Sequence, residues 1–583
     1  MVRRVKKRQT APSWLHAVGL GCAALAFSVI GWSEMLRAYP KTQNGDGQFF
    51  QEMIEAMRVS IVDFHELPLW NPYQCGGVPL WDNPQGVSAA PVLWLLLPFG
   101  TTRSIQLWYI AHSAIGFLCM WVFARRELSL SRGAALVASL AFAFAGVHNQ
   151  HLTGGHLVWG PYLYFPLALF FWRRAEHDLW HAVGVGAVVA WTVHEGGTYP
   201  LPYLALILGL ETATRAWHPA RILPIVRAGV VVVVVGFCLG ASRFLPVLDQ
   251  LRSHSRQLGE EHDAMTWQTL KSVFLARDHG RGVPGQDYAW TEYGDYLGPI
   301  IMGLSLVGMV TGGVERAWML APLVLSFLLM LGHIGPWAPW PLLKGHVYPF
   351  KQMRVPSRFD ACVTVFVTAY AGLAVDRLIA LAGRLRSSPR VGRALRVVIL
   401  GVALLGAADI MVAGIAFGAQ FFTSTPADAR VVGSPRLYIG GPALAGFIDQ
   451  PTQHRGQLGC WEEWAFERGA PLWSGDVPQA RAVDANATIR SVTRTQNRFT
   501  LEVSAKAATR LLLNDTYDRG WTASVGSVVR SGEQLAVDVP AGDRTLVVRY
   551  WPHGLTAGFV ITGLTLAGLL GLVVVGRRPR MAG

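Results

Sequence analysis

Residues 1–34 read MVRRVKKRQTAPSWLHAVGLGCAALAFSVIGWSE, and this stretch decides the fold. Five basic residues lie among the first eight, and no Lys, Arg, Asp or Glu then occurs before Glu34. At about 1.5 Å per residue, such an uncharged stretch is long enough to cross a bilayer as a helix. It is also longer than the apolar region of a typical cleaved signal peptide. We therefore expect a retained first transmembrane helix with a cytoplasmic N-terminus.

The rest of the chain repeats this alternation of uncharged and Arg-rich segments. Of its 583 residues, 51% are hydrophobic and only 15% are charged, whereas soluble globular chains carry about 25% charged residues. The formal net charge of +14 could indicate nucleic-acid binding. The basic residues flank apolar stretches, however, as the positive-inside rule predicts for a membrane protein. We therefore expect membrane lipids as partners and no nucleic acid.

Apolar stretches predict about twelve transmembrane helices. Besides the first, their centres lie near residues 114, 140, 164, 188, 206, 232, 304, 326, 368, 408 and 566. With this count, the Arg clusters of alternate connections all fall on the side of the N-terminus. The 87–99 stretch is too short for a span and is interpreted as interfacial or re-entrant. This pattern predicts a multi-pass protein of the bacterial cytoplasmic (inner) membrane with both termini in the cytoplasm.

The predicted topology divides the chain into three parts. Residues 1–420 form a polytopic transmembrane domain, and residues 421–553 form an extracytoplasmic domain that is β-rich from about residue 480. Residues 554–583 hold the last transmembrane helix and a basic cytoplasmic tail. The long connections of the first part fall outside the membrane, and they are residues 38–88, 243–293 and 335–356.

Three runs of the C-terminal domain alternate apolar and polar residues. The apolar faces are Phe499-Leu501-Val503, Leu535-Val537-Val539 and Leu546-Val548-Tyr550, with Gly, Asp and Asn between the runs. Short alternating strands separated by turn residues predict a small antiparallel β-sandwich. Cys75 and Cys460 both fall in predicted external segments, where either a disulfide or two free thiols are compatible with the sequence.

The first external segment carries the densest polar motifs. Asn44-Gly45-Asp46-Gly47 lies just outside the first helix, where an acidic residue between glycines is suited to meet a lipid-linked substrate. The alternative is an ordinary Asx turn. Trp70-Asn71-Pro72-Tyr73 follows, and aromatic faces can stack on sugar rings while amides bind their hydroxyls. The alternative there is an interfacial aromatic belt.

Further candidates lie at the outer ends of later spans. His148, His151 and His156 are either metal ligands or interfacial hydrogen-bonding groups. Arg354 and Arg358 flank a proline on the outer face, against the positive-inside bias. They could clamp a phosphate or diphosphate with bidentate hydrogen bonds, or anchor the chain to headgroups.

These segments, in their order and spacing, resemble the bacterial YfhO-like membrane proteins, which are similar to the GT-C superfamily of polytopic glycosyltransferases. The chain departs from that pattern at Gly197-Thr198-Tyr199-Pro200, where a Gly-His-Pro-Gln-like segment is expected. The segments that carry the resemblance are Asp46, Leu69-Trp70-Asn71-Pro72-Tyr73, Gly77-Val78-Pro79-Leu80, Gly155-His156, Tyr296-Leu297-Gly298, Arg354-Val355-Pro356-Ser357-Arg358-Phe359 and Tyr517-Asp518-Arg519-Gly520-Trp521.

The resemblance implies a mainly α, GT-C-like fold and a glycosyltransferase that acts at the outer membrane surface. Its donor would be a polyprenyl-phosphate sugar, and its acceptor an envelope glycan, lipid or protein. In such enzymes an acidic residue of the first external loop is the general base or a metal ligand, and that role falls on Asp46. A divalent metal ion is thus a candidate cofactor, without assigned ligands. The residues that we expect to bind substrate are Trp70, Asn71, Tyr73, His156, Glu292, Arg354 and Arg358.

Two other functions are alternatives to a glycosyltransferase. A transporter or flippase of lipid-linked glycans predicts charged residues along an internal pathway, and often inverted repeats. Here the charges of interest cluster at the outer ends of spans, and the sequence shows no evident repeat. A non-catalytic envelope assembly factor predicts no loss of function when Asp46 or Arg358 is changed. The sequence has no P-loop and no convincing Rossmann fingerprint, which argues against a nucleotide-driven pump.

Overall fold

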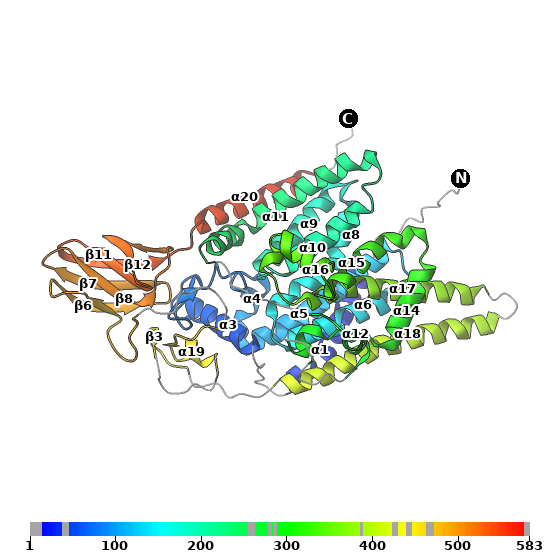
Figure 1. Cartoon of the computed structure of the whole chain (residues 1–583), viewed down its shortest axis with the longest axis horizontal. Coiled ribbons are helices and arrows are strands. Elements are labelled where there is room, and N and C mark those ends of the chain that lie inside the picture. The colour runs from blue at the N-terminus through cyan, green and yellow to red at the C-terminus, as the bar shows by residue number, and fades with distance from the viewer. Residues whose placement is uncertain are drawn as a thin grey trace.

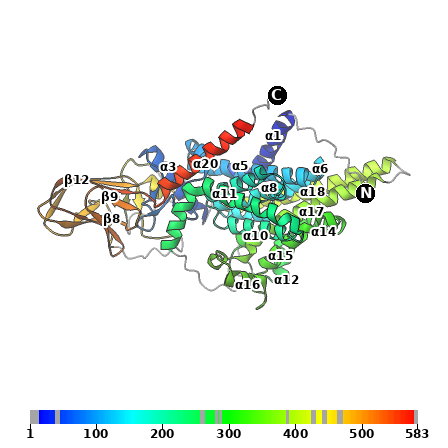
Figure 2. The same ribbon diagram turned by 90° about the horizontal axis from the view of Figure 1, so that it is seen from above.

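The chain folds into a helical body with β-sheets at one end, as Figure 1 shows. Figure 2 gives the same two-part arrangement from above. The mainly helical architecture with a β-rich C-terminal region is the one that the sequence predicts. The structure is a computed structural model, and it describes residues 14–37, 46–254, 263–277, 283, 288–384, 389–422, 430–438, 446–461 and 471–576.

Seven helical spans among the described residues are long and apolar enough to cross a membrane. The chain therefore has the helices of an integral membrane protein. The number twelve stays a prediction, because centres near 140 and 326 fall on helices of only 12 and 11 residues. The main helices of the seven spans are α1 (Trp14–Gly31), α5 (Thr101–Val122), α11 (Pro219–Ser253), α14 (Gly298–Thr311), α17 (Asp360–Gly383), α18 (Pro389–Phe421) and α20 (Leu555–Gly576).

Shorter helices fill the space between the spans and form the external segments. The α-helices among them are α2 (Ser33–Arg37), α3 (Asp46–Val62), α4 (Pro91–Leu96), α6 (Arg132–Ala143), α7 (Gly146–Thr153), α8 (Phe165–Ala175), α9 (Leu179–His194), α10 (Pro200–Ala213), α12 (Trp267–Leu275), α13 (Trp290–Tyr293), α15 (Leu320–Met330), α16 (Pro339–His346) and α19 (Asp449–Thr452). Short 3-10 helices are η1 (Leu97–Phe99), η3 (Leu157–Tyr164), η4 (Val314–Met319), η5 (Phe350–Gln352) and η6 (Pro356–Phe359), and η2 (Phe123–Glu127) is a π-helix.

Two four-stranded antiparallel sheets make up the C-terminal domain, in the orders β10-β11-β8-β5 and β6-β7-β12-β9. The predicted alternation is confirmed, since the apolar faces of β7, β11 and β12 are buried in one shared core. The strands are β5 (Ala480–Ala482), β6 (Ala487–Arg494), β7 (Arg498–Ala505), β8 (Thr509–Thr516), β9 (Trp521–Ala523), β10 (Ser527–Ser531), β11 (Gln534–Val539) and β12 (Gly542–Tyr550); two further pairs are β1 (Trp70–Asn71) with β2 (Val78–Pro79) and β3 (Arg436–Leu437) with β4 (Arg455–Gly456).

The first external segment is docked onto this β-domain. The Trp70 ring lies 4.6 Å from that of Tyr550, measured between centroids, and joins the core of the sheets. Cys75 and Cys460, whose pairing the sequence leaves open, form a disulfide. These contacts fix segments that are far apart in the sequence beside the start of α3.

Candidate functional site

Asp46 is the first residue of α3, so its carboxylate lies at a helix N-terminus, where the helix dipole favours negative charge. Its Oδ2 accepts a hydrogen bond of 2.8 Å from Nε2 of His156. Its Oδ1 accepts one of 2.7 Å from Nε1 of Trp461. The side chain is 40% exposed, so the carboxylate is held on both oxygens yet remains open to a cavity.

A glycine allows His156 to reach Asp46. Gly155 has φ +97°, and a Cβ at this position would overlap the backbone of Gly47. Only glycine permits both this backbone conformation and this close approach. The Nδ1 atoms of His156 and His151 are 2.8 Å apart, which links the two imidazoles.

Glu292 and Arg358 form a bidentate ion pair in the same region. Nε of Arg358 donates to Oε2 at 2.8 Å, and Nη2 donates to Oε1 at 2.6 Å. Ser357 adds a hydrogen bond of 2.6 Å from its hydroxyl to the backbone oxygen of Glu292. Val355 precedes this turn with φ +64°, which is unusual for a β-branched residue and is typical of strained functional segments.

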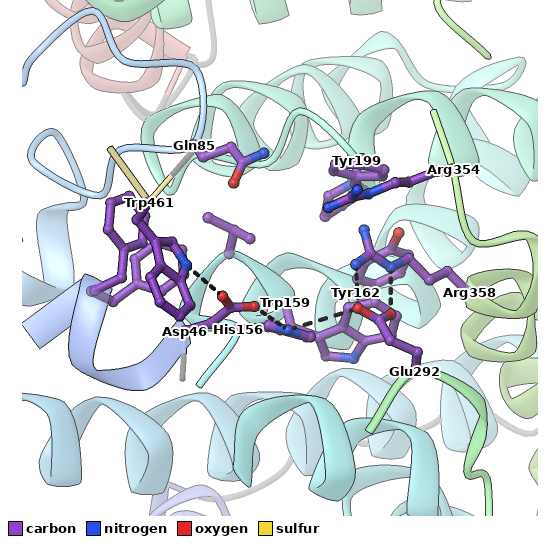
Figure 3. Close-up of a pocket in the computed structure, with 14 residues that line it drawn as sticks. Asp46, Gln85, His156, Trp159, Tyr162, Tyr199, Glu292, Arg354, Arg358 and Trp461 are labelled. Carbon is purple, nitrogen blue, oxygen red and sulfur yellow. Dashed lines mark hydrogen bonds and ion pairs between the residues drawn. The ribbon is translucent and has the colours of Figure 1, made fainter. Parts of the chain in front are cut away.

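One polar cavity of about 140 Å³ collects these groups. Figure 3 shows Asp46 and Trp461 on one side of it and Arg354 and Arg358 on the other. The structure thus brings together five of the residues predicted from the sequence, which come from four distant segments: Asp46, His156, Glu292, Arg354 and Arg358.

The other predicted residues lie elsewhere. Trp70 donates its indole N–H to Asp515 at 3.2 Å, and Asn71 donates to Glu52 at 3.0 Å. Trp70 is buried in the core of the β-domain, Asn71 is buried against α3, and Tyr73 is buried in the core of the helical body, where its hydroxyl bonds the His454 ring. Their role in substrate binding stays a prediction, and of the three only Trp70 is shown to bind a strand of the two sheets, through Asp515 of β8.

Three further cavity residues are not among the site residues predicted from the sequence. Trp461 is recognisable only once its neighbour Cys460 is known to be bonded to Cys75. Tyr199 lies in the segment that departs from the family pattern, and the Arg358 guanidinium lies 4.6 Å from its ring centroid. Gln85 is the last residue of the stretch from Leu69 that is dense in aromatic and amide side chains, a composition that predicts contacts to sugar rings and hydroxyls.

The polar cavity favours a charged histidine beside a charged aspartate. Burial alone would lower the pKa of His156, but Glu292 and Asp46 outweigh it, so the pKa of His156 is raised. Burial alone would raise the pKa of Asp46, but the hydrogen bond and charge of His156 and the Trp461 N–H hold this pKa below its ordinary value. Burial keeps the pKa of His151 well below its ordinary range. The hydrogen bond between His156 and Asp46 therefore raises the pKa of the histidine and lowers the pKa of the aspartate.

A second, apolar cavity of about 600 Å³ adjoins the polar one. Gln85 and Tyr199 line both cavities. Leu201, Val247 and Leu248 contribute to its apolar wall. A molecule with an apolar tail and a polar head can therefore occupy both spaces across this shared boundary.

Part of the polar cavity has the donor chemistry of a cation site. One ligand atom each from His151, His156 and Glu292 lie within 4.8 Å of one another. Two imidazole nitrogens and a carboxylate oxygen suit a divalent transition metal. A carboxylate has about four lone-pair sites, so Glu292 can serve both Arg358 and a cation. These residues therefore fit a divalent metal ion.

Comparisons with known proteins give similarity at the level of solved structures. No protein-family model matches the sequence, and no curated protein matches it. The arabinofuranosyltransferase AftD from Mycobacteria matches with a TM-score of 0.44 and 15% identity, over 69% of this chain and 27% of that chain. A point mutant of AftD matches with a TM-score of 0.48 and 14% identity, over 77% of this chain and 33% of that chain.

An archaeal oligosaccharyltransferase gives a similar result. AglB from Archaeoglobus fulgidus, in complex with an inhibitory peptide and a dolichol-phosphate, matches with a TM-score of 0.43 and 11% identity. The match covers 78% of this chain and 66% of that chain. The chain thus spans only about a quarter to a third of the length of AftD.

Proposed function

We propose that this protein is a membrane glycosyltransferase that moves a sugar from a polyprenyl-phosphate donor to an envelope acceptor on the extracytoplasmic face. The observation that carries the proposal is the pair of adjoining cavities. One is polar, with carboxylates, histidines and arginines, and the other is apolar and larger. A lipid-linked sugar needs both environments at one boundary, which Gln85 and Tyr199 provide here.

Asp46 is the general base in this mechanism. The bond between the sugar and the phosphate oxygen breaks as the acceptor oxygen forms a new bond to the same sugar carbon. The acceptor hydroxyl gives its proton to Asp46, and the lipid phosphate leaves with the electron pair of the broken bond. Sugar transfer passes through an oxocarbenium-like state. A positioned base typically contributes about 10²–10⁴-fold to the rate.

Arg354 and Arg358 supply positive charge where the phosphate gains negative charge. Arg358 keeps two of its nitrogen atoms on Glu292, which fixes the guanidinium in place before the substrate arrives. A divalent cation held by His151, His156 and Glu292, when bound, supplies further charge to the phosphate oxygens. His156 also holds the Asp46 carboxylate in its ionised form through their hydrogen bond.

The proposal is tested by the envelope glycans of a deletion strain. Wild-type protein should restore the missing glycan, and Asp46→Asn should not, although the variant reaches the membrane in normal amount. Asp63→Asn is the matched control, because Asp63 follows the same helix α3 and pairs with Arg430 outside the polar cavity. Full restoration by Asp46→Asn would contradict the transferase and favour an assembly role.

A further inference from the structure

Arg243 is a buried arginine that the mechanism above does not use. It lies in α11, which runs beside α20 in Figure 1 and Figure 2, and its side chain is 1% exposed. Arg243 lines the apolar cavity, together with Gln85 at the boundary with the polar cavity. A cation in an apolar wall costs folding free energy unless an anion or several acceptors compensate it.

Only one nitrogen of this guanidinium is engaged within the described part of the chain. Nη2 donates to the backbone oxygen of Gly86 at 2.7 Å and to that of Asn83. Nε and Nη1 are buried and have no hydrogen-bond partner among the described residues. Two backbone carbonyls therefore fix the orientation of the group and leave two of its nitrogen atoms unpaired.

No carboxylate of the described residues lies within ion-pair distance of Arg243. Asp82 acts on it electrostatically from farther away. Burial raises the pKa of Asp82 well above its ordinary range. Asp82 is also within 3.0 Å of the hydroxyl of Tyr550, which donates to it. Within the described residues, the guanidinium of Arg243 therefore has no carboxylate in direct contact, and its Nε and Nη1 stay without a hydrogen-bond partner.

The cavity around Arg243 favours an anionic lipid. Its walls are apolar, as shown by Leu201, Val247 and Leu248, which suits a hydrocarbon tail. Unpaired guanidinium nitrogens suit phosphate oxygens, since arginine binds phosphate through parallel N–H donors. A free phosphate would bind the arginine but would make no use of the apolar wall. A neutral lipid would fill the apolar space but would leave the charge of the arginine uncompensated.

We propose that Arg243 binds the phosphate of the lipid-linked donor while the lipid tail occupies the apolar cavity. This inference rests on the proposed function, and it assigns the phosphate contact to a residue outside the outer arginine pair. Arg354 and Arg358 then act on the sugar side of the phosphate, and Arg243 holds it from the tail side. Gln85 and Tyr199 lie between the two groups of arginines, since they line both cavities.

Lipid binding by the purified full-length protein in nanodiscs tests this assignment. The probes are undecaprenyl phosphate, undecaprenol and inorganic phosphate. Hydrogen bonds to a charged group predict that Arg243→Gln weakens the binding of undecaprenyl phosphate about tenfold or more. The binding of undecaprenol should not change, and millimolar inorganic phosphate should not compete. Arg227→Gln is the matched control, because Arg227 is an exposed arginine of the same helix outside the cavity.

Three results would overturn the proposal. The first is unchanged binding of undecaprenyl phosphate by Arg243→Gln. The second is that Arg243→Gln and Arg243→Lys each weaken the binding of undecaprenyl phosphate and of undecaprenol to the same extent. This result would show that Arg243 maintains the shape of the cavity and does not bind the phosphate. The third is competition by inorganic phosphate, which would indicate a site for a soluble anion.

Binding and sugar transfer fail separately in this design. If Arg243→Gln still prefers undecaprenyl phosphate to undecaprenol while Asp46→Asn abolishes glycan formation, only the assignment of Arg243 is wrong. If Arg243→Gln loses this preference while Asp46→Asn restores the glycan, only the proposed sugar transfer is wrong.

Discussion

The indole Nε1 of Trp461 lies 2.7 Å from Oδ1 of Asp46, although 415 residues separate the two in the sequence. Trp461 directly follows Cys460, which is bonded to Cys75 in the first external segment. The disulfide therefore keeps the tryptophan beside the carboxylate. With His156 on Oδ2, each oxygen of Asp46 accepts one hydrogen bond and keeps a second lone pair for an acceptor hydroxyl.

Trp461→Phe should move the acid limb of the pH–rate profile to higher pH. The indole N–H is one of the groups that hold the pKa of Asp46 down, and phenylalanine keeps the ring but lacks this donor. Loss of one hydrogen bond predicts a shift of about one pH unit or less. Trp473→Phe is the control, because its indole donates to Pro478 outside the cavity. A shift to lower pH, or an equal shift in both variants, would refute this role of Trp461.

His156→Gln should destabilise the protein most at mildly acidic pH. The pKa of His156 is raised above 6.5, so the folded chain binds this proton more tightly than the unfolded chain does. The resulting stabilisation is complete below the unfolded pKa and is lost as pH rises through the folded pKa. The difference in Tm between wild type and variant should therefore shrink as pH increases above 6.5. Thermal unfolding in detergent measures this, and a growing difference would disagree with the raised pKa.

The lowered pKa of Asp46 sets the acid end of the pH range in which this pair stabilises the fold. It is held below 3.8, so its stabilisation is present above that value and is lost as pH falls through the folded pKa. The stabilising effect of the Asp46–His156 pair should therefore be greatest between 3.8 and 6.5. Thermal unfolding of wild type and Asp46→Asn at acidic pH measures this loss of stabilisation.

Gly155→Ala should separate His156 from Asp46. The added Cβ would overlap the backbone of Gly47, and alanine is strained at φ +97°. Strain of this kind costs about 1–3 kcal/mol of folding free energy. Sugar transfer should fall at least tenfold because the imidazole moves from the carboxylate. Gly335→Ala serves as control, since a Cβ there meets nothing within 4 Å. Activity and Tm equal to the control would contradict the close approach.

Asn71→Ala should lower stability more than activity. Asn71 is 2% exposed and donates to the buried carboxylate of Glu52. Loss of this donor predicts about 1–3 kcal/mol of destabilisation. Turnover per folded molecule should stay within about threefold of wild type. Unchanged Tm with abolished turnover would instead support the sugar-binding role that the sequence predicts for Asn71.

Asn71 also shows where the sequence was ambiguous. Aromatic and amide side chains near a membrane surface have the same composition whether they bind a sugar or join two domains. Trp70 is buried in the core of the β-domain and Tyr73 in that of the helical body, and only the tertiary structure distinguishes these environments from an open groove. By contrast, the alternation of Phe499-Leu501-Val503 was enough to predict which face of its strand is buried, because a two-residue period is a local property.

The polar cavity was partly predictable for a similar reason. Asp46, Glu292 and Arg358 are charged residues at the outer ends of apolar stretches, and topology alone places such ends on one side of the membrane. Topology gives no distances between side chains, so the ion pair between Glu292 and Arg358 could be identified only in the structure. Trp461 was missed because its position depends on a disulfide across 385 residues.

The central claim is that the carboxylate of Asp46 drives sugar transfer, and the release of lipid phosphate tests it most directly. Detergent-solubilised protein is incubated with the lipid extract and envelope fraction of the deletion strain, and free polyprenyl phosphate is measured by mass spectrometry. A flippase would release none, because translocation does not break the bond between the sugar and the phosphate oxygen. We predict release by wild type and by Asp63→Asn, and a rate about 10²–10⁴-fold lower for Asp46→Asn. Release by Asp46→Asn within about threefold of wild type would contradict the account.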